Sequence, residues 1–374
     1  MTAALFTPLT LGTITLPNRI AVAPMCQYMA NDGCATLWHL QHLAGLGMSG
    51  AGLVMLEATA VSRQGRITHG CLGLYSDATE AALSATLANV RRMALSGTAF
   101  GVQLSHAGRK GSATRPWESG GALTRDTWPT LAPSPLPHRE GWHQPQAATK
   151  ADLDAIEADF RAAAERAMRL GFEVIEVHMA HGYLLHQFHS ALSNRRDDAW
   201  GGDAERRLAF PLRVAAAVRA AAPGIAVGAR ITGSDWSPSG LDVTDAITLA
   251  ARLKALGLDY VCVTSSGIPV ATPTVADPDA AQIALAAQVR DATGFATRAV
   301  GLIVTPEQAN AIIVAGQADQ VALGRAFLDD PRWAWHAAHR LGVTLNYPAP
   351  YAWAAPAEWP GMAQAHKAEQ CSHM

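Results

Sequence analysis

The sequence has few charged residues, no long apolar run and no basic block, and each absence excludes a class of protein. Only 16% of the 374 residues are charged, and the formal net charge is −2. Such a composition argues against a nucleic-acid or anionic-membrane surface. No apolar run is long enough to cross a bilayer, and the N-terminal stretch MTAALFTPLTLGTITLPNR lacks the basic region of a secretory signal. We therefore expect neither a nucleic-acid nor a membrane partner.

The cysteines are too few and too scattered to suggest a disulfide framework or an iron–sulfur cluster. Their number is odd, and no two have the C-x-x-C spacing. The five are Cys26, Cys34, Cys71, Cys262 and Cys371. A reduced protein of the cytoplasm is the plainest interpretation.

What the sequence does have is a regular alternation of short apolar runs with amphipathic, Ala-rich stretches. Eight runs predict strands: residues 19–25, 52–61, 99–106, 172–180, 225–232, 260–266, 296–301 and 319–325. They are continuously apolar, which indicates burial on both faces and hence a parallel sheet. Four of the predicted helices begin with an Asp that can cap them, at 77–97, 152–171, 203–221 and 242–257. Eight strand–helix units predict a single (β/α)8 TIM barrel, with an open doubly wound sheet as the alternative.

Two segments fall outside this repeat. Residues 107–149, after the third strand, are rich in Pro, Gly, Trp and Ser, and a connection of this length predicts a functional loop. Residues 341–374 carry Tyr and Trp among prolines. We predict a barrel over residues 1–340 and an ordered C-terminal arm over 341–374 that packs on something, such as a second subunit.

Polar side chains stand at the C-terminal ends of the predicted strands, where the loops of a barrel converge on its chemistry. They are Cys26, Gln103, His106, His178, His181, Arg230, Ser265 and Arg325. Any one of them could be a satisfied core residue. Their convergence on one face is the stronger evidence for a site.

Residues 177–190, VHMAHGYLLHQFHS, hold four histidines. The first pair, His178 and His181, could bind a metal, could be structural, or could donate two N–H bonds to one substrate oxygen, with Tyr183 supplying a proton. A metal needs a third ligand, and this pair lies where a strand ends. We favour the donor pair and expect no metal. His186 and His189 are expected to be structural.

Of two glycine patterns in the sequence, only one indicates a phosphate site. GLGMSG at 45–50 has the letters of the dinucleotide-binding motif, but it ends a predicted helix and precedes a strand, so it indicates a helix end and a turn. Gly301, Gly324 and Arg325 end the last two strands, where barrels often hold a phosphate. A Schiff-base aldolase would need a lysine at a strand end, and the sequence has none there, although Lys110 lies in a neighbouring loop.

Taken together, these residues resemble the old yellow enzyme family of FMN-dependent ene reductases. The matching segments run in order over nearly the whole chain: PNRIAVAPMCQYMANDG, GVQLSHAGRK, GFEVIEVHMAHGYLLHQFHSALSNRRDDAWGGDAERR, SSG and VALGRAF. Cys26 and the tail resemble the bacterial, thermophilic-like subgroup that includes the xenobiotic reductases.

The resemblance implies a cofactor site and a substrate site at named positions. For FMN, it implies ring contacts from Pro24, Met25 and Ala58, with Cys26 tuning the potential, Gln103 on the pyrimidine edge and Arg230 near N1. It implies a phosphate site at Gly301, Gly324 and Arg325. For the substrate, it implies a carbonyl held by His178 and His181, a proton from Tyr183 and a pocket lined by Tyr28.

The activity that the resemblance implies is reduction of the C=C bond of α,β-unsaturated carbonyl compounds. NAD(P)H, with NADPH favoured, would reduce the flavin, whose N5 would pass hydride to the β-carbon while Tyr183 protonates the α-carbon. Three alternatives stay open: reduction of nitro compounds or quinones, a flavin-binding barrel without turnover, and a metal-dependent barrel hydrolase.

The tail departs from one branch of the family. Many thermophilic-like relatives place an Arg near a tail tyrosine into the neighbouring subunit's site, whereas here Tyr351 is followed by Ala352 and Trp353. We predict a homodimer or homotetramer in which Trp353 closes the neighbour's substrate pocket.

Overall fold

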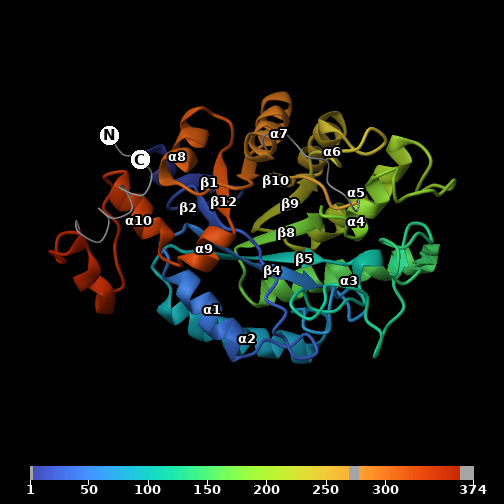
Figure 1. The fold of residues 1–374 in the computed structure, drawn as a ribbon, viewed down its shortest axis with the longest axis horizontal. Coiled ribbons are helices and arrows are strands. Elements are labelled where there is room, and N and C mark those ends of the chain that lie inside the picture. Colours follow the sequence, from blue (N-terminus) through green and yellow to red (C-terminus); the bar gives the residue numbers. More distant parts are fainter. Residues whose placement is uncertain (1–2, 269–277, 363–374) are drawn as a thin grey trace.

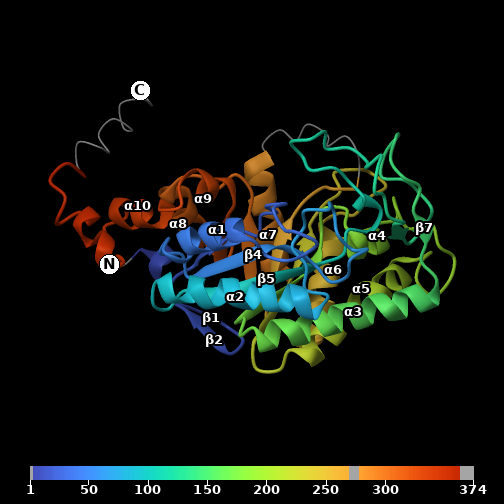
Figure 2. The same cartoon turned by 90° about the horizontal axis from the view of Figure 1, so that it is seen from below.

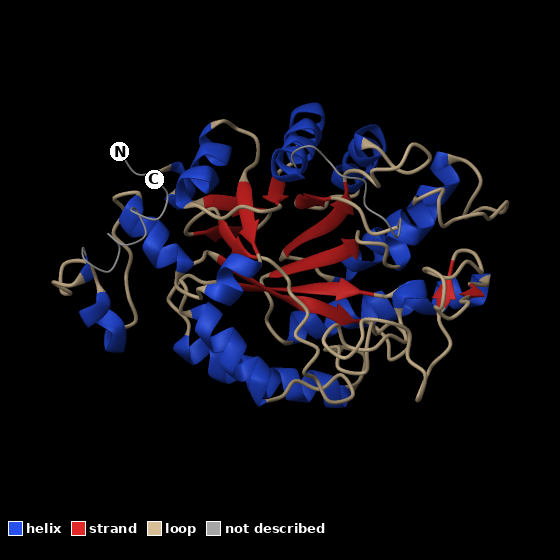
Figure 3. Cartoon of the chain, in the orientation of Figure 1, coloured by secondary structure: helices blue, strands red, loops and turns tan. Residues whose placement is uncertain are grey.

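The computed structural model, which describes residues 3–268 and 278–362, has a closed barrel of eight parallel strands at its centre (Figures 1 and 3). The strands are β3 Ile20–Val22, β4 Leu53–Ala60, β5 Ala99–Ser105, β8 Val174–Met179, β9 Ala226–Thr232, β10 Tyr260–Thr264, β11 Thr297–Val300 and β12 Gln320–Leu323. They pair in this order, and β12 closes the barrel on β3. All eight lie within their predicted ranges, so the predicted (β/α)8 barrel is confirmed.

Helices follow every strand and form the outer layer, as α2 and α3 do outside β4 and β5 in Figure 2. They are α1 Leu37–Gly47, α2 Asp77–Met93, α3 Lys150–Arg169, α4 Leu184–His189, α5 Ala204–Ala221, α6 Val243–Ala255, α7 Pro278–Thr293, α8 Pro306–Val314, α9 Arg325–Asp329 and α10 Trp333–Arg340. The end of α1 at Gly47, with Met48 as its C-cap, confirms that GLGMSG is a helix end and a turn. Among the described helices, none is long and apolar enough to span a membrane.

Short elements complete the chain. They are η1 Ala4–Phe6, the hairpin of β1 Leu9–Leu11 and β2 Ile14–Leu16, η2 Gly108–Lys110, the pair β6 Leu131–Ala132 and β7 Gln146–Ala147, and η3 Ala349–Ala354. The pair β6–β7 and η2 belong to the long loop after β5, and η3 belongs to the arm.

Alternation along the strands divides the barrel residues between two apolar cores. One core lies between strands and helices and includes Val54, Val102 and Val177. The other lies inside the barrel, where Leu53 and Val174 meet Leu11 of the hairpin. Burial of these side chains stabilises the barrel by roughly 25 cal/mol per Å² of apolar surface removed from water. This inner core fills the end of the barrel where the strands begin, so the polar residues of the same strands lie nearer the end where the strands stop.

The register of the strands brings predicted site residues to neighbouring levels of the barrel. Gln103 pairs with Ala58 on β4 and with Glu176 on β8. Two residues further along β8, His178 pairs with Arg230 on β9. Because side chains point inward at every second position of a strand, Glu176 and His178 face the same interior.

Candidate active site

The first part of the site is the turn after β8, which carries the predicted histidine pair. The backbone N–H of Ala180 donates to Nδ1 of His178 at 3.2 Å, so the proton of that imidazole sits on Nε2. This Nε2 lies 3.4 Å from Nδ1 of His181, and the two rings are 5.2 Å apart at their centroids. The two histidines of the predicted pair therefore lie side by side at the end of β8.

Tyr183 and the long loop after β5 complete this side. The ring of Tyr183 stands 4.9 Å from that of His178. The ammonium of Lys110 lies 5.1 Å from the centroid of the Tyr183 ring and donates to the carbonyl oxygen of His181 at 2.9 Å. Lys110 does not end a strand, so the sequence did not place it in the site. In the structure it contacts both His181 and Tyr183 and therefore borders the site.

Burial decides the protonation states in this turn. Burial, reinforced by the positive charge of Arg230, holds the pKa values of His178 and His181 well below their usual range. Burial raises the pKa of Tyr183 well above its usual value. At neutral pH both imidazoles are therefore uncharged with one N–H each, and the phenol keeps its proton.

The segment after β3 forms a second wall. Burial, followed by the charge of Glu57, raises the pKa of the Cys26 thiol. Tyr28 has a left-handed backbone with φ of 52°, and its ring meets Trp117 of the long loop edge-on at 6.0 Å. The thiol is therefore neutral at pH 7, and the roles of Cys26 beside the flavin and of Tyr28 in the substrate pocket stay predictions.

A buried polar network inside the barrel holds Gln103, and sequence reasoning did not find it. The amide Nε2 of Gln103 donates to Glu176 at 2.7 Å. The other oxygen of Glu176 accepts from Tyr260 at 3.0 Å and from Arg298 at 2.9 Å. Because the amide nitrogen is bound to a carboxylate, the amide oxygen of Gln103 is turned away from Glu176 and is free to accept a hydrogen bond. This is the orientation needed to meet the N3–H of a flavin.

A cavity of about 570 Å³ opens at the ends of β11, β12 and β3. Its lining includes predicted cofactor residues from four separated parts of the chain: Pro24, Met25, Arg230, Gly301, Gly324 and Arg325. The Nε of Arg230 is buried and has no hydrogen-bond partner among the described residues. Gly301 has φ of 128°, and a Cβ there would lie 2.8 Å from Gln282, so only glycine leaves its backbone open to an anion.

This donor set fits FMN. A buried cation without a partner suits the electron-rich N1 edge of a flavin, and a glycine backbone beside Arg325 suits its phosphate. Pro24, Met25, Arg230 and the three phosphate residues share one cavity. Ala58 and Gln103 are paired neighbours on β4 and β5.

Trp353 is the predicted site residue that this chain does not bring to its own site. Its side chain is 79% exposed. The arm packs through Tyr347 and Tyr351 against Trp335 of α10, at centroid distances of 4.4 and 6.1 Å. In Figures 1 and 2 the arm lies beside α10, on the opposite side of the molecule from α4. Residues 363–374 of the predicted arm lie outside the described residues.

Comparison with known proteins agrees with this geometry. Residues 4–343 match the model of the NADH:flavin oxidoreductase / NADH oxidase family. An NADPH dehydrogenase of Geobacillus thermodenitrificans is 38% identical over 94% of this chain and 98% of its own length. An NADH:flavin oxidoreductase of Gibberella zeae is 40% identical over 91% of this chain and 86% of its own length. Morphinone reductase, solved in complex with tetrahydroNAD, superimposes with a TM-score of 0.73 at 31% identity, over 92% of this chain and 93% of its own.

The barrel, the cofactor cavity and these relatives define an FMN-dependent oxidoreductase that uses NAD(P)H. The chain belongs to the old yellow enzyme family within that class, as its motifs led us to expect.

Proposed function

We propose that this protein reduces the C=C bond of α,β-unsaturated carbonyl compounds. The observation that carries the proposal is the pair of neutral imidazoles whose facing nitrogens lie 3.4 Å apart beside a protonated tyrosine. Two N–H groups at this spacing can both reach one oxygen atom, since each hydrogen bond spans about 2.9 Å.

Thr264 makes such a double donor possible. Its hydroxyl lies 3.1 Å from Nε2 of His181. Without a substrate, the Nε2–H of His178 donates to Nδ1 of His181, whose own proton is then on Nε2 toward Thr264. When a substrate oxygen takes the place of this hydrogen bond, the Thr264 hydroxyl can donate to Nε2 of His181, and the proton of His181 moves to Nδ1. A carbonyl oxygen between them then accepts two hydrogen bonds, and negative charge that builds on it during reduction is stabilised. Removal of one such donor typically costs on the order of a hundredfold in rate.

The remaining residues supply a proton and a fixed charge. Tyr183 keeps its proton at neutral pH, so it can deliver it to the α-carbon. Bound FMN, reduced by NAD(P)H, supplies the hydride for the β-carbon, and Arg230 is placed to balance the negative charge that reduction adds to the ring.

The test follows the colour of the purified holoenzyme. We expect a yellow protein with FMN absorbance that NADPH bleaches under anaerobic conditions and that cyclohexenone restores with formation of cyclohexanone. NADH, a quinone and a nitro compound are run beside them to find the preferred partners. A colourless protein with hydrolase activity, or a yellow one that cyclohexenone never reoxidises, would contradict the proposal.

We also propose that the active unit is a homodimer or a larger homo-oligomer in which Trp353 reaches the neighbouring site. Support comes from the apolar side chains left exposed on the arm side of the molecule. Trp353 is 79% exposed and Leu37 is 82% exposed, and Tyr351 and Leu37 border the same groove of about 590 Å³ between α1 and α10. Exposed apolar clusters of this kind often mark interfaces between proteins. A location in the cytoplasm stays a prediction.

A further inference from the structure

The turn that joins the histidine pair to Tyr183 has an unusual backbone. His181 has φ of 57° and Gly182 has φ of 72°, both in the left-handed region. A non-glycine residue in that region is strained and persists only where its surroundings enforce it. A side chain at position 182 would collide with the carbonyl oxygen of Gly267. The positions of both the second imidazole and the phenol depend on what holds this turn.

Two successive residues of α4 hold Gly182 from both sides. The N–H of Gly182 donates to Nδ1 of His186 at 2.9 Å. The carbonyl oxygen of Gly182 accepts from the amide of Gln187 at 2.7 Å. His186 and Gln187 are both fully buried, so neither bond competes with water. The backbone of the turn is therefore fixed by two fully buried side chains of α4.

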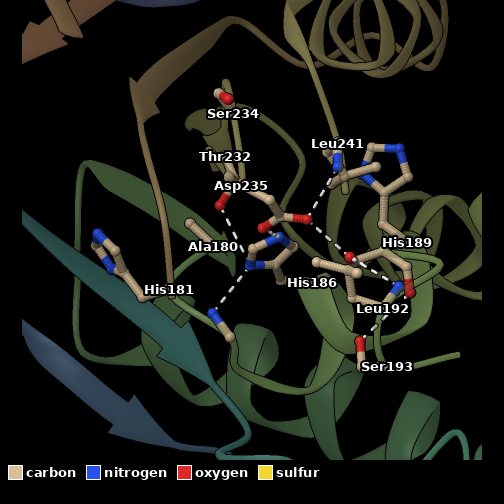
Figure 4. A network of polar contacts seen from close by, with 12 residues as sticks. Ala180, His181, His186, His189, Leu192, Ser193, Thr232, Ser234, Asp235 and Leu241 are labelled. Carbon is tan, nitrogen blue, oxygen red and sulfur yellow. Dashed lines mark hydrogen bonds and ion pairs between the residues drawn. The ribbon is translucent and has the colours of Figure 1, made fainter. Parts of the chain in front are cut away.

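The acceptor on His186 exists only in one tautomer, and Asp235 selects it. Nε2 of His186 lies 3.1 Å from Oδ1 of Asp235, and each of these buried atoms has no other partner among the described residues. The other oxygen of Asp235 accepts from Ser190 at 2.7 Å and from the N–H of Leu241 at 3.0 Å (Figure 4). Because a carboxylate only accepts, Nε2 of His186 must carry the proton and Nδ1 must be bare.

We propose that His186 and Asp235 are positioning residues of the substrate clamp. Asp235 keeps His186 in its Nε2–H tautomer, so that Nδ1 accepts from Gly182 and fixes the left-handed turn between His181 and Tyr183. This assignment rests on the proposed function, because it concerns the turn that carries the carbonyl clamp. It gives the third histidine of the sequence motif a specific task.

Asp235→Asn is the variant that reverses the tautomer. Asn has one acceptor oxygen, which the donors from Ser190 and Leu241 require, so its NH₂ group faces Nε2 of His186. That nitrogen must then accept, and the proton moves to Nδ1, where it opposes the N–H of Gly182 and can donate instead to the hydroxyl of Thr232 at 3.2 Å. With FMN bound, we expect the affinity for 4-hydroxybenzaldehyde, read from its charge-transfer band, to fall about tenfold, as for the loss of one buried hydrogen bond.

Ser190→Ala is the matched control. It removes one hydrogen bond from the same carboxylate at the same burial but leaves Oδ1 facing His186, so we expect the phenol affinity to stay within about twofold of the parent, even where thermal stability falls. Equal losses of phenol affinity in Asp235→Asn and Ser190→Ala would overturn the proposal. So would parental affinity in Asp235→Asn.

A second measurement stands even where Asp235→Asn fails to fold. In the parent holoenzyme labelled with ¹⁵N at histidine, the ring shifts of His186, assigned by their absence in His186→Asn, should show a protonated Nε2 and a bare Nδ1. A protonated Nδ1 would overturn the proposal. The pair His186→Asn and His186→Leu adds a rescue, since the amide oxygen of Asn can replace Nδ1 as acceptor and Leu cannot. Only the Asn variant should keep phenol affinity.

Enone turnover of the parent protein is measured in the same series. A parent protein that binds the phenol and shows the expected His186 tautomer, yet never reduces an enone, would contradict the proposed function alone. Oxidation of the NADPH-reduced holoenzyme by molecular oxygen needs no carbonyl clamp, so its rate should be unchanged in Asp235→Asn. If Asp235→Asn slowed oxidation of the reduced holoenzyme by oxygen as much as oxidation by the enone, the damage would be general, and the positioning assignment would be overturned.

Discussion

The turn after β8 and the C-terminal arm are both predicted to contact the substrate, yet the turn is buried and the arm is largely exposed. His178 is 3% exposed, and the turn beside it is bound through the backbone by Lys110 and His186. Trp353 is 79% exposed, and η3, in which it stands, has no buried residue. The turn is held by contacts within the chain, whereas Trp353 of the arm is left largely exposed.

This difference shows how each region can contribute to substrate binding. A preorganised donor pair acts without rearrangement, because the cost of ordering it was met during folding. An exposed aromatic arm lowers its free energy only when a second surface covers it. Changes in the turn should therefore act equally at any protein concentration, and changes in the arm should act through association.

The largest expected effect is that of His178→Ala combined with His181→Ala. Loss of both N–H donors should slow reduction of cyclohexenone by roughly a thousandfold or more and weaken phenol binding, since each donor is worth about a hundredfold. FMN should stay bound, because neither residue lines the phosphate cavity. Stopped-flow rates at several protein concentrations would check that the loss is independent of concentration. Parental rates in the double variant would exclude the clamp.

Arg325→Ala should have the next largest effect, and on the cofactor rather than the substrate. Hydrogen bonds to a charged group contribute about 1.5–3 kcal/mol, so the dissociation constant of FMN should rise about tenfold to a hundredfold. Fluorescence titration of the apoprotein with FMN measures it. Arg340→Ala, which removes an exposed partner of Glu307 at 2.9 Å, is the matched control and should change it less than twofold. Equal FMN affinity in both variants would remove Arg325 from the phosphate site.

The contrast between these regions also marks how far the sequence could predict the molecule. The eight strands could be predicted because short, continuously apolar runs are typical of parallel strands that are buried on both faces. Helix starts were less certain, since several small polar residues compete for the cap. Asp203 and Asp242 do cap their helices, whereas Ser76 and Thr149 cap the two that were expected to begin at Asp77 and Asp152.

Site residues at strand ends could be predicted, and residues deeper in the barrel could not. His178 and Arg230 end their strands, so the barrel rule found them. Glu176 and Arg298 stand inside strands buried on both faces, where no alternation tells an inward position from an outward one. Lys110 reaches His181 across 71 positions of the sequence, a contact that only the folded loop creates.

The arm should give a moderate effect that depends on association. A chain shortened to end at Leu345 should bind enones about twofold to tenfold more weakly, the value of an aromatic contact of 0.5–1.5 kcal/mol, and should sediment closer to a monomer. Trp353→Ala separates the two effects, because it keeps the packing of Tyr351 on Trp335. It should lose enone affinity and remain an oligomer.

Mixing makes this arm prediction sharper. The shortened chain has an intact clamp, and the His178→Ala, His181→Ala chain has an intact arm. After subunit exchange, parental enone affinity should return at the sites where the clamp of a shortened chain meets the arm of a His178→Ala, His181→Ala chain. A shortened chain that stays a fully active oligomer by itself would contradict the shared site.

Cys26→Ser should have the smallest effect, and it tests the wall that faces the flavin rather than the substrate clamp. Because burial and Glu57 raise the pKa of Cys26, its thiol is neutral at pH 7, and a hydroxyl in its place alters hydrogen bonding but not charge. A change of about 0.5–1.5 kcal/mol in that bond corresponds to a shift of roughly 10–30 mV in the midpoint potential of a two-electron couple. Dye-linked redox titration measures the shift, with Cys34→Ser as the control on the same segment. Both half-reactions should change in rate while turnover persists, since hydride transfer and the proton from Tyr183 do not pass through sulfur. An unchanged potential would leave Cys26 as an apolar packing residue, which is how a free cysteine often behaves.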